Sequence, residues 1–257
     1  MSKDAPVQAI VKAAEILRCF YTHEELGLTE LSQELGYNKS TAAGLVASLR
    51  HVGFLEQNER GHLILGRELF YLGSHVNIHL SDICRPYLEK MCADSGETVN
   101  LAIRDGAMVA YLNKIESAHS VRICTSIGQR LPFYCTAVGK AIFSCLDREE
   151  TERAFASAVP HRLTQKTITD LAQLQNDLDI SRERGYALDI EELEAGLICV
   201  AVPIIDKNGY PIAAVSISGP SQRMTDAAIE QAAVSAMEAA EQISAKYRYY
   251  HFESSSL

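Results

Sequence analysis

The sequence predicts an α+β fold in two parts, a small helical part followed by a larger part that mixes strands with helices. In residues 10–49, apolar side chains recur at helical spacing in three successive segments. Residues 53–65 then form two short strand-like runs around a turn that contains glycine. After residue 97, strand-like runs separated by turn signals dominate. Two domains also fit a length of 257 residues, since one domain typically has about 100 to 150.

Charge and composition limit the class of protein. The chain has 24 Lys and Arg against 33 Asp and Glu, and this net charge of −9 excludes a protein that coats nucleic acid by bulk positive charge. No stretch approaches the roughly 18 apolar residues of a membrane span, and residues 1–30 lack a secretory signal pattern. The seven cysteines include no C-x-x-C pair, as suits packed thiols in a reducing compartment. We therefore expect a cytoplasmic protein with no membrane partner, no metal and no cofactor.

The first three helices are interpreted as a three-helix unit that contains a helix-turn-helix. An apolar stripe over 10–20 predicts the first helix, and the second runs from an N-cap at Thr29 to a left-handed C-terminal residue at Gly36. Only Tyr37 and Asn38 separate it from the third helix, which Asn38 can cap. The periodicity of the third helix leaves these residues facing outward: Lys39, Ser40, Ala43, Gly44, Ala47 and Ser48.

The strand pair at 53–65 is then a wing, in a stretch more basic than the chain as a whole. Residues 38–67 hold four basic and two acidic residues. The start of a recognition helix enters the major groove, while wing side chains and helix-start amides hold phosphates. The side chains of Ala43 and Gly44 are too short to reach far into the groove, so recognition of the bases must depend on neighbouring residues and on DNA shape. The predicted DNA contacts are Lys39, Ser40, Thr41, Ala43, Gly44, Ser48 and Arg60. The alternative is an ordinary three-helix cap on a larger protein.

The chain beyond the wing divides into a linker and a second domain. A helix over 68–80 is interpreted as the linker between residues 1–67 and residues 81–257. A break near Ser81-Asp82 and a helix through Met91 follow. Two strands then flank the hairpin signal Asp105-Gly106. The expected strands are Thr98–Arg104, Ala107–Ile115, Val121–Cys124, Tyr186–Ile190, Cys199–Ile205 and Ile212–Ser218. The expected helices are Ala137–Leu146, Asp170–Arg184 and a closing helix from Thr225 or Asp226 to about Tyr247.

Catalytic motifs are incomplete. Gly139-Lys140 lacks the phosphate-loop frame, because Tyr134 stands at the first glycine position. Ser218-Gly219 lacks the G-x-S-x-G frame of a hydrolase. Cys199 lies in an apolar run, where an inert buried thiol is expected. A solvated loop is the interpretation for three acidic residues that follow a predicted strand, Glu191, Glu192 and Glu194. We therefore predict no catalytic residues.

Asp189 differs from this acidic cluster because it ends a strand. Ser216 and Ser218, two residues apart, point from one face of another strand. Together with backbone N–H groups at the start of the helix at Ala137, these side chains can line a cavity for a small anion that carries hydroxyl or keto groups. The alternative is a set of satisfied polar groups in the core.

Short sequence blocks along the chain follow one another in a recognisable order. The early blocks are IVKAAEIL at 10–17, LTELS at 28–32 and NKST at 38–41. The later and more specific blocks are ETVNL at 97–101, GQRLP at 128–132, TAVGKA at 136–141, GYALD at 185–189, GLICVAVP at 196–203 and SISGP at 216–220. On these blocks the chain resembles the IclR family of bacterial transcriptional regulators along nearly its whole length.

The resemblance implies an N-terminal winged helix-turn-helix, a linker helix and a C-terminal GAF-like effector-binding domain, in a homodimer or homotetramer. It also implies a pocket for a small carboxylate, in which Asp189 accepts from a hydroxyl or a hydrate. The positions carried over are Ile123, Ser126, Ala137, Val138, Asp189, Cys199, Ser216 and Ser218. The family often has an aromatic residue or His followed by Arg where this chain has Ala43-Gly44. The operator sequence therefore cannot be borrowed from relatives.

The leading hypothesis is a ligand-responsive transcriptional repressor, without enzymatic activity, of genes for catabolism of a small organic acid such as a sugar acid or 2-oxoacid. Its partners are double-stranded operator DNA and the carboxylate effector. An enzyme with a helical cap is the second hypothesis, and the incomplete catalytic motifs argue against it. A DNA-bound architectural protein is the third, and the net acidic charge argues against it.

Overall fold

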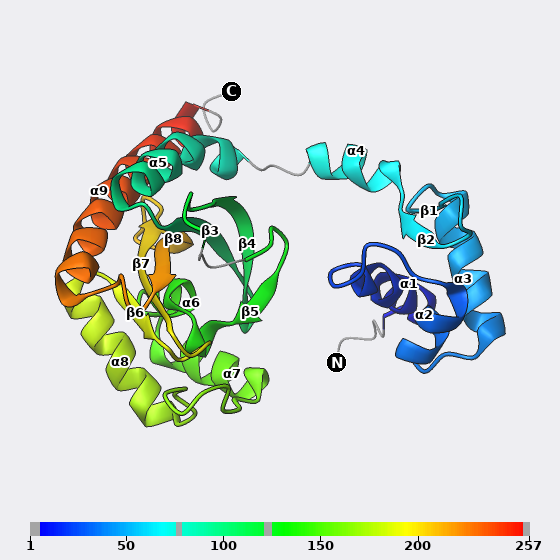
Figure 1. Ribbon diagram of the computed structural model, residues 1–257, viewed down its shortest axis with the longest axis horizontal. Coiled ribbons are helices and arrows are strands. Elements are labelled where there is room, and N and C mark those ends of the chain that lie inside the picture. The colour runs from blue at the N-terminus through cyan, green and yellow to red at the C-terminus, as the bar shows by residue number, and fades with distance from the viewer. Residues whose placement is uncertain (1–5, 76–78, 121–124, 254–257) are drawn as a thin grey trace. The chain divides into compact units, whose positions relative to one another are not determined.

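The computed structural model describes residues 6–75, 79–120 and 125–253. The chain separates into two compact units, residues 1–78 and residues 79–257. Figure 1 labels their helices and strands. None of the described helices is long and apolar enough to cross a membrane.

The first unit is a winged helix-turn-helix. Its elements are α1 (Gln8–Cys19), α2 (Leu28–Glu34), α3 (Lys39–His51), β1 (Leu55–Gln57), β2 (Leu63–Leu65) and α4 (Arg67–His75). Gly36 ends α2 with φ +65°, and the Asn38 side chain accepts a hydrogen bond from Thr41 N at 2.8 Å at the start of α3. The expected N-cap at Thr29 is wrong. The N-cap is Gly27, two residues earlier, because the Glu30 carboxylate accepts from Gly27 N at 2.7 Å, and α2 begins at Leu28.

A single apolar cluster holds this unit together. Ala42, Val46 and Leu49 of α3 are buried, which confirms the inward face that the periodicity predicts. The wing strands are antiparallel, with Leu55 opposite Leu65, and an antiparallel bridge between Leu26 and Leu63 joins β2 to the segment before α2. Cluster members come from α1, α2, α3, both strands and the segment between α1 and α2: Ile16, Cys19, Phe20, Leu26, Leu31, Val46, Leu49, Leu55 and Leu63.

The second unit is built on a six-stranded sheet in the order β5-β4-β3-β8-β7-β6. Every neighbouring pair is antiparallel, which confirms the α+β class. The strands are β3 (Thr98–Asp105), β4 (Met108–Ile115), β5 (Arg130–Pro132), β6 (Ala187–Ile190), β7 (Leu197–Ile205) and β8 (Pro211–Pro220). The helices are α5 (His79–Ser95), η1 (Phe133–Cys135), α6 (Ala137–Phe143), α7 (Arg148–Ala158), α8 (Leu171–Arg184) and α9 (Asp226–Glu253).

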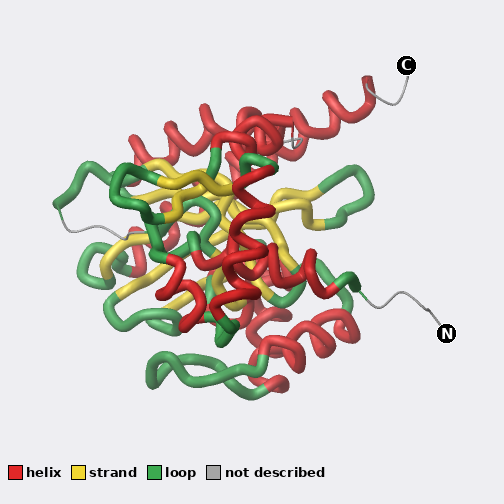
Figure 2. Tube along the Cα trace, turned by 90° about the vertical axis from the view of Figure 1, so that its right-hand side faces the viewer, coloured by secondary structure: helices red, strands yellow, loops and turns green. Residues whose placement is uncertain are grey.

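Both faces of the sheet are covered by helices. One apolar cluster joins the sheet to α5 and α9, and a second joins its other face to η1, α6, α7 and α8. In Figure 2 the long α9 runs along one side of the yellow strands. Side chains along a strand alternate between the two faces of the sheet. The polar side chains of β8 that point to the face covered by α6 therefore lie beside the apolar cluster that includes η1, α6, α7 and α8.

Several expected boundaries need correction. The break near Ser81-Asp82 is absent, since α5 runs without interruption from His79 to Ser95. The closing helix continues to Glu253, beyond Tyr247. Helix α7 and strand β5 were not expected. Helix α7 buries few residues and has a charged outer face, so its apolar pattern is weak. Asp147 caps this helix by accepting a hydrogen bond from Glu150 N at 2.7 Å. The expected strand Val121–Cys124 lies outside the described residues.

Candidate functional site

The second unit contains a cavity of about 440 Å³ on the α6 side of its sheet. Its walls come from β4, the 125–132 segment, the start of α6, the loop after α7 and strands β6 to β8. The lining residues are Tyr111, Thr125, Gln129, Leu131, Pro132, Thr136, Ala137, Val138, His161, Leu163, Asp189, Leu193, Glu194, Leu197, Cys199, Ser216 and Ser218. The volume suits a small molecule.

Strand register brings the polar residues of this cavity together. In the antiparallel ladders Asp189 lies opposite Cys199, and Cys199 lies opposite Ser218. Directly opposed residues point to the same face, so the three side chains form a row across β6, β7 and β8. Ser216 lies two residues from Ser218 on the same face, with their Oγ atoms 3.5 Å apart.

Asn100 on β3 extends this row and was not predicted as a site residue. Its Nδ2 lies 3.4 Å from the Oγ atoms of both Ser216 and Ser218, and its Oδ1 accepts from Thr125 Oγ1 at 2.6 Å. Asn100 is almost fully buried and therefore fixes the orientation of the hydroxyls behind the cavity wall. A polar residue in the otherwise apolar run of β3 is the sequence signal that could have identified it.

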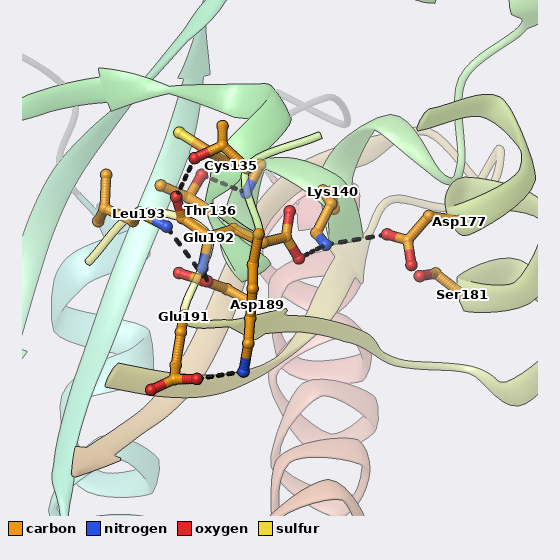
Figure 3. Close-up of polar contacts among 12 residues, drawn as sticks. Cys135, Thr136, Lys140, Asp177, Ser181, Asp189, Glu191, Glu192 and Leu193 are labelled. Atoms are coloured by element: carbon orange, nitrogen blue, oxygen red, sulfur yellow. Dashed lines mark hydrogen bonds and ion pairs between the residues drawn. The ribbon is translucent and has the colours of Figure 1, made fainter. Parts of the chain in front are cut away.

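Asp189 is the main charged group of the cavity, with 1% of its surface exposed. Its Oδ1 accepts from Glu192 N at 2.7 Å and from Leu193 N at 3.4 Å (Figure 3). Its Oδ2 has no hydrogen-bond partner among the described residues. Burial, together with the negative charge of Glu192, raises the pKa of Asp189 to about 7.

Lys140 and Glu192 form a buried ion pair beside Asp189. Lys140 Nζ lies 2.5 Å from Glu192 Oε1 and 2.9 Å from Asp177 Oδ2, and the lysine side chain is 1% exposed (Figure 3). Burial acts to lower the pKa of Lys140, but the two carboxylates outweigh it and raise that pKa, so the ammonium stays charged. The expectation that Glu192 belongs to a solvated loop is wrong. Its loop packs against Lys140 of α6, and Thr167 Oγ1, in the segment between α7 and α8, donates to Glu192 O at 2.7 Å.

The other two members of the acidic cluster are more accessible. Glu191 is paired with Lys166, and Glu194 is exposed at the wall of the cavity. The thiol of Cys199 is buried, and burial raises its pKa well above the ordinary value. A neutral thiol is a poor nucleophile, so the geometry provides no activated cysteine here. Within the described ranges, no group of His, Cys, Asp and Glu side chains could hold a metal ion.

Six of the eight predicted pocket residues line this one cavity: Ala137, Val138, Asp189, Cys199, Ser216 and Ser218. Ser126 is exposed and is not among the lining residues, whereas its neighbour Thr125 is buried and lines the cavity. The predicted residue Ile123 lies outside the described residues. Tyr111, His161 and Leu163 were missed, because their segments carry no sequence pattern that places them near β6 to β8.

The predicted DNA-contact residues occupy the outer face of α3 and the tip of the wing. Lys39, Ser40, Gly44 and Ser48 are exposed, and Thr41 and Ala43 are half-buried. The side chain of Arg60, in the turn between β1 and β2, is 79% exposed and lies 3.4 Å from the Glu25 carboxylate. A Cβ at Gly44 would meet no atom within 4 Å, so open space surrounds this position.

Comparison with known proteins agrees with this architecture. Residues 9–59 match the IclR helix-turn-helix domain, and residues 73–245 match the family described as bacterial transcriptional regulator IclR C-terminal. The helix-turn-helix match excludes an ordinary three-helix cap.

Two relatives and one solved structure illustrate the similarity. The chain is 33% identical to the HTH-type transcriptional regulator KdgR of Escherichia coli, with 96% of this chain and 95% of that protein covered. It is also 33% identical to the acetate operon repressor of Salmonella typhimurium, with 94% and 90% covered. The crystal structure of IclR from Thermotoga maritima superposes with a TM-score of 0.75 at 33% identity, covering 94% of this chain and 99% of that one.

These relatives are transcriptional regulators, which excludes the hypothesis of an enzyme with a helical cap. Both halves of the chain match the family in the order that the sequence blocks predict. The chain therefore belongs to the IclR family of bacterial transcriptional regulators.

Proposed function

We propose that this regulator is a repressor that binds operator DNA through its first unit and a small carboxylate through the cavity of its second unit. The DNA-binding domain is assigned to residues 1–67, the linker to 68–80 and the effector-binding domain to 81–257. The observation that carries the proposal is the cavity, whose polar wall holds two serine hydroxyls and Asp189, one of whose oxygens has no partner in the part of the chain that the structure describes. Buried polar groups require partners, and a small polar ligand can provide them.

The chemistry of the walls favours a short acid with hydroxyl or keto groups. Thr125, Ser216, Ser218 and Asp189 supply hydrogen-bonding groups on one side, and apolar side chains such as Leu131 make up much of the remainder. Helix-start amides at Ala137 and Val138 add N–H donors of the kind that bind carboxylates. A sugar acid or a 2-oxoacid combines these groups. The name of the Salmonella typhimurium relative, which refers to an acetate operon, supports a role in the metabolism of carboxylic acids.

The first unit fits a dimeric DNA reader. A single short helix and wing bury too little surface for tight specific binding, so two copies, in a homodimer or a homotetramer, would meet two half-sites. Lys39, Ser40 and Thr41 at the start of α3 and Arg60 in the wing are assigned to phosphates. Ala43, Gly44 and Ser48 lie further along the same helix and are assigned to the groove.

Titration of candidate acids tests the effector site. Sugar acids and 2-oxoacids are screened by thermal shift, since a ligand at 100 times its Kd adds about 2.7 kcal/mol of stability. The binders are then titrated calorimetrically into wild type, Ser218→Ala and Ser126→Ala. We expect Ser218→Ala to weaken binding by about 1 to 3 kcal/mol, because it removes a hydrogen bond inside the cavity. Ser126→Ala is the matched control, since this serine is exposed outside the cavity.

The coupling between effector and DNA is tested with the promoter region upstream of the regulator's own gene. Fluorescence anisotropy should show that the acid changes DNA affinity, by a coupling of typically 1 to 3 kcal/mol, and DNA should change acid affinity by the same factor. Equal binding of the acid by wild type and Ser218→Ala would place the site elsewhere. Absence of coupling in wild type would exclude an allosteric effector.

A further inference from the structure

We propose that Asp189 takes part in ligand binding as a neutral carboxylic acid that donates a hydrogen bond from Oδ2, so that an anionic ligand binds together with one proton. This inference rests on the proposed effector site and adds that Asp189 must be protonated for an anionic ligand to bind there. It concerns the described part of the second unit, where the contacts of Asp189 are defined.

The hydrogen-bond geometry distinguishes the two oxygens of Asp189. Oδ1 is occupied as an acceptor by the amides of Glu192 and Leu193. Oδ2 is buried, has no partner among the described residues and belongs to a residue that lines the cavity. An ionised Asp189 would present a second negative oxygen to a ligand carboxylate. A protonated Oδ2 instead donates to that carboxylate in a charge-assisted hydrogen bond.

Among the described residues, the surroundings of Asp189 contain too little positive charge to neutralise it. The titratable groups that face it from other positions are Glu192 after β6, Lys140 on α6, Cys199 on β7, Cys135 on η1 and Tyr111 on β4. Burial raises the pKa of both thiols and of the Tyr111 hydroxyl, so all three stay neutral. Lys140 is the one cation of this set, and it already faces two other carboxylates, on Glu192 and Asp177. Two further titratable side chains, those of His161 and Glu194, line the cavity wall.

A second anion in this cavity therefore needs a proton. The buried cluster already holds more carboxylates than cations, and an added unpaired charge in a dry environment is expensive. When the carboxylate ligand enters, hydronium or the acid form of the buffer transfers one proton to the Asp189 carboxylate, so the bond to that proton breaks in the donor as the new O–H bond forms on Oδ2. The negative charge of the ligand and the positive charge of the proton cancel, so the net charge of the cavity is unchanged.

The test is calorimetric titration of the full-length protein with pyruvate, lactate and gluconate at pH 6 and pH 8. If only protonated Asp189 binds the anion and its pKa is about 7, the Kd should rise about tenfold between these pH values. At pH 8, titrations in buffers of different ionisation enthalpy should report uptake of about 0.9 proton per ligand. The corresponding neutral amides, pyruvamide, lactamide and gluconamide, should bind with little pH dependence.

Three variants identify the side chain that takes up the proton when the ligand binds. Asp189→Asn keeps a hydrogen-bond donor and an acceptor without charge, so it should bind the acids with neither pH dependence nor proton uptake. Glu192→Gln removes the neighbouring negative charge and should move the midpoint of the pH dependence to lower pH. His161→Asn removes the histidine that lines the cavity and should leave the pH dependence intact.

The outcomes separate this inference from the proposed function. Binding of an acid without pH dependence or proton uptake in wild type would overturn the inference and leave the effector site standing. Retention of the pH dependence in Asp189→Asn, or its loss in His161→Asn, would assign the proton to another group and also overturn it. If none of the three acids binds wild type at pH 6, the proposed carboxylate site fails for this ligand class, and the inference falls with it.

Discussion

Replacement of Lys140 with methionine should destabilise the second unit strongly. The change removes the ammonium that faces Glu192 and Asp177, while methionine preserves most of the side-chain volume. The Glu192 side chain is 8% exposed and that of Asp177 is 25% exposed, so most of the cost arises at Glu192. Removing one partner of a buried ion pair costs about 3 to 5 kcal/mol, because the remaining charge stays buried without compensation. For a unit of this size, about 2 to 4 °C is lost per kcal/mol, and the Tm should fall by roughly 6 to 20 °C.

The pH dependence of the loss has a defined sign. Burial already raises the pKa of Glu192, and removal of Lys140 raises it further. A carboxyl whose pKa is higher in the folded than in the unfolded state contributes stability below its unfolded pKa, and that contribution is lost as the pH rises through the folded pKa. The variant should therefore be closer to wild type at pH 5 than at pH 8.

Thermal denaturation of wild type and variants at both pH values checks this reasoning. Lys166→Met is the matched control, because Lys166 pairs with Glu191 but is 55% exposed, and such surface pairs contribute about 0 to 1 kcal/mol. The double variant Lys140→Met with Glu192→Gln should recover part of the loss, since the uncompensated charge is gone. Equal Tm values for Lys140→Met and Lys166→Met at pH 8 would refute the buried-pair argument.

Three further predictions concern the DNA face and the cavity. Lys39→Ala and Arg60→Ala should each weaken DNA binding and reduce the slope of log K against log salt by about one unit, as measured by anisotropy at several salt concentrations; unchanged slopes would place the interface elsewhere. Gly44→Ala should stabilise α3 by about 0.5 to 1 kcal/mol in thermal denaturation, because the added methyl meets open space in a helix interior. A fall in operator affinity in the same variant would indicate close approach of the helix to DNA at Gly44, whereas unchanged affinity would remove Gly44 from the contacts. For Asp189, whose pKa rises from 3.8 to about 7, wild type should lose stability relative to Asp189→Asn as the pH increases from 4 to 7, and parallel stability curves would contradict the raised pKa.

The sequence by itself determined the elements whose signals are local. The Asn38 cap, the Gly36 ending and the inward face of α3 follow from residues at most a few positions apart. The hairpin at Asp105-Gly106 and the ending of α8 at Gly185 are local in the same sense. The strand pattern indicated Asp189, Ser216 and Ser218, and the family resemblance added Cys199; all four line one cavity.

Local signals were insufficient where two of them compete, as at the start of α2, or where the outcome depends on a distant partner. Thr29 is a good N-cap residue by type, yet a glutamate in the first turn fixes the start of α2 at Leu28. Helix α7 was missed because its many charged residues leave only a weak apolar pattern in the sequence. Its few apolar residues are buried through packing against α8 and η1. Asn100 was missed as a site residue because its hydrogen bonds reach Ser216 and Ser218, more than 100 residues away.

Only the tertiary structure decided the electrostatics of the cavity. From its residue type, Glu192 is expected to be exposed to solvent. The Gly139-Lys140 dipeptide gives no indication that the lysine is buried in an ion pair. The fold brings Lys140 on α6 against the loop after β6, 52 residues away along the chain, and the two form a buried pair. Because Lys140 faces Glu192 and Asp177, Asp189 has no ion-pair partner within the described ranges. Periodicity and motif order record which residues share an element, whereas the energy of a charge depends on solvent exposure and on distances through space, which the packing of separate elements sets.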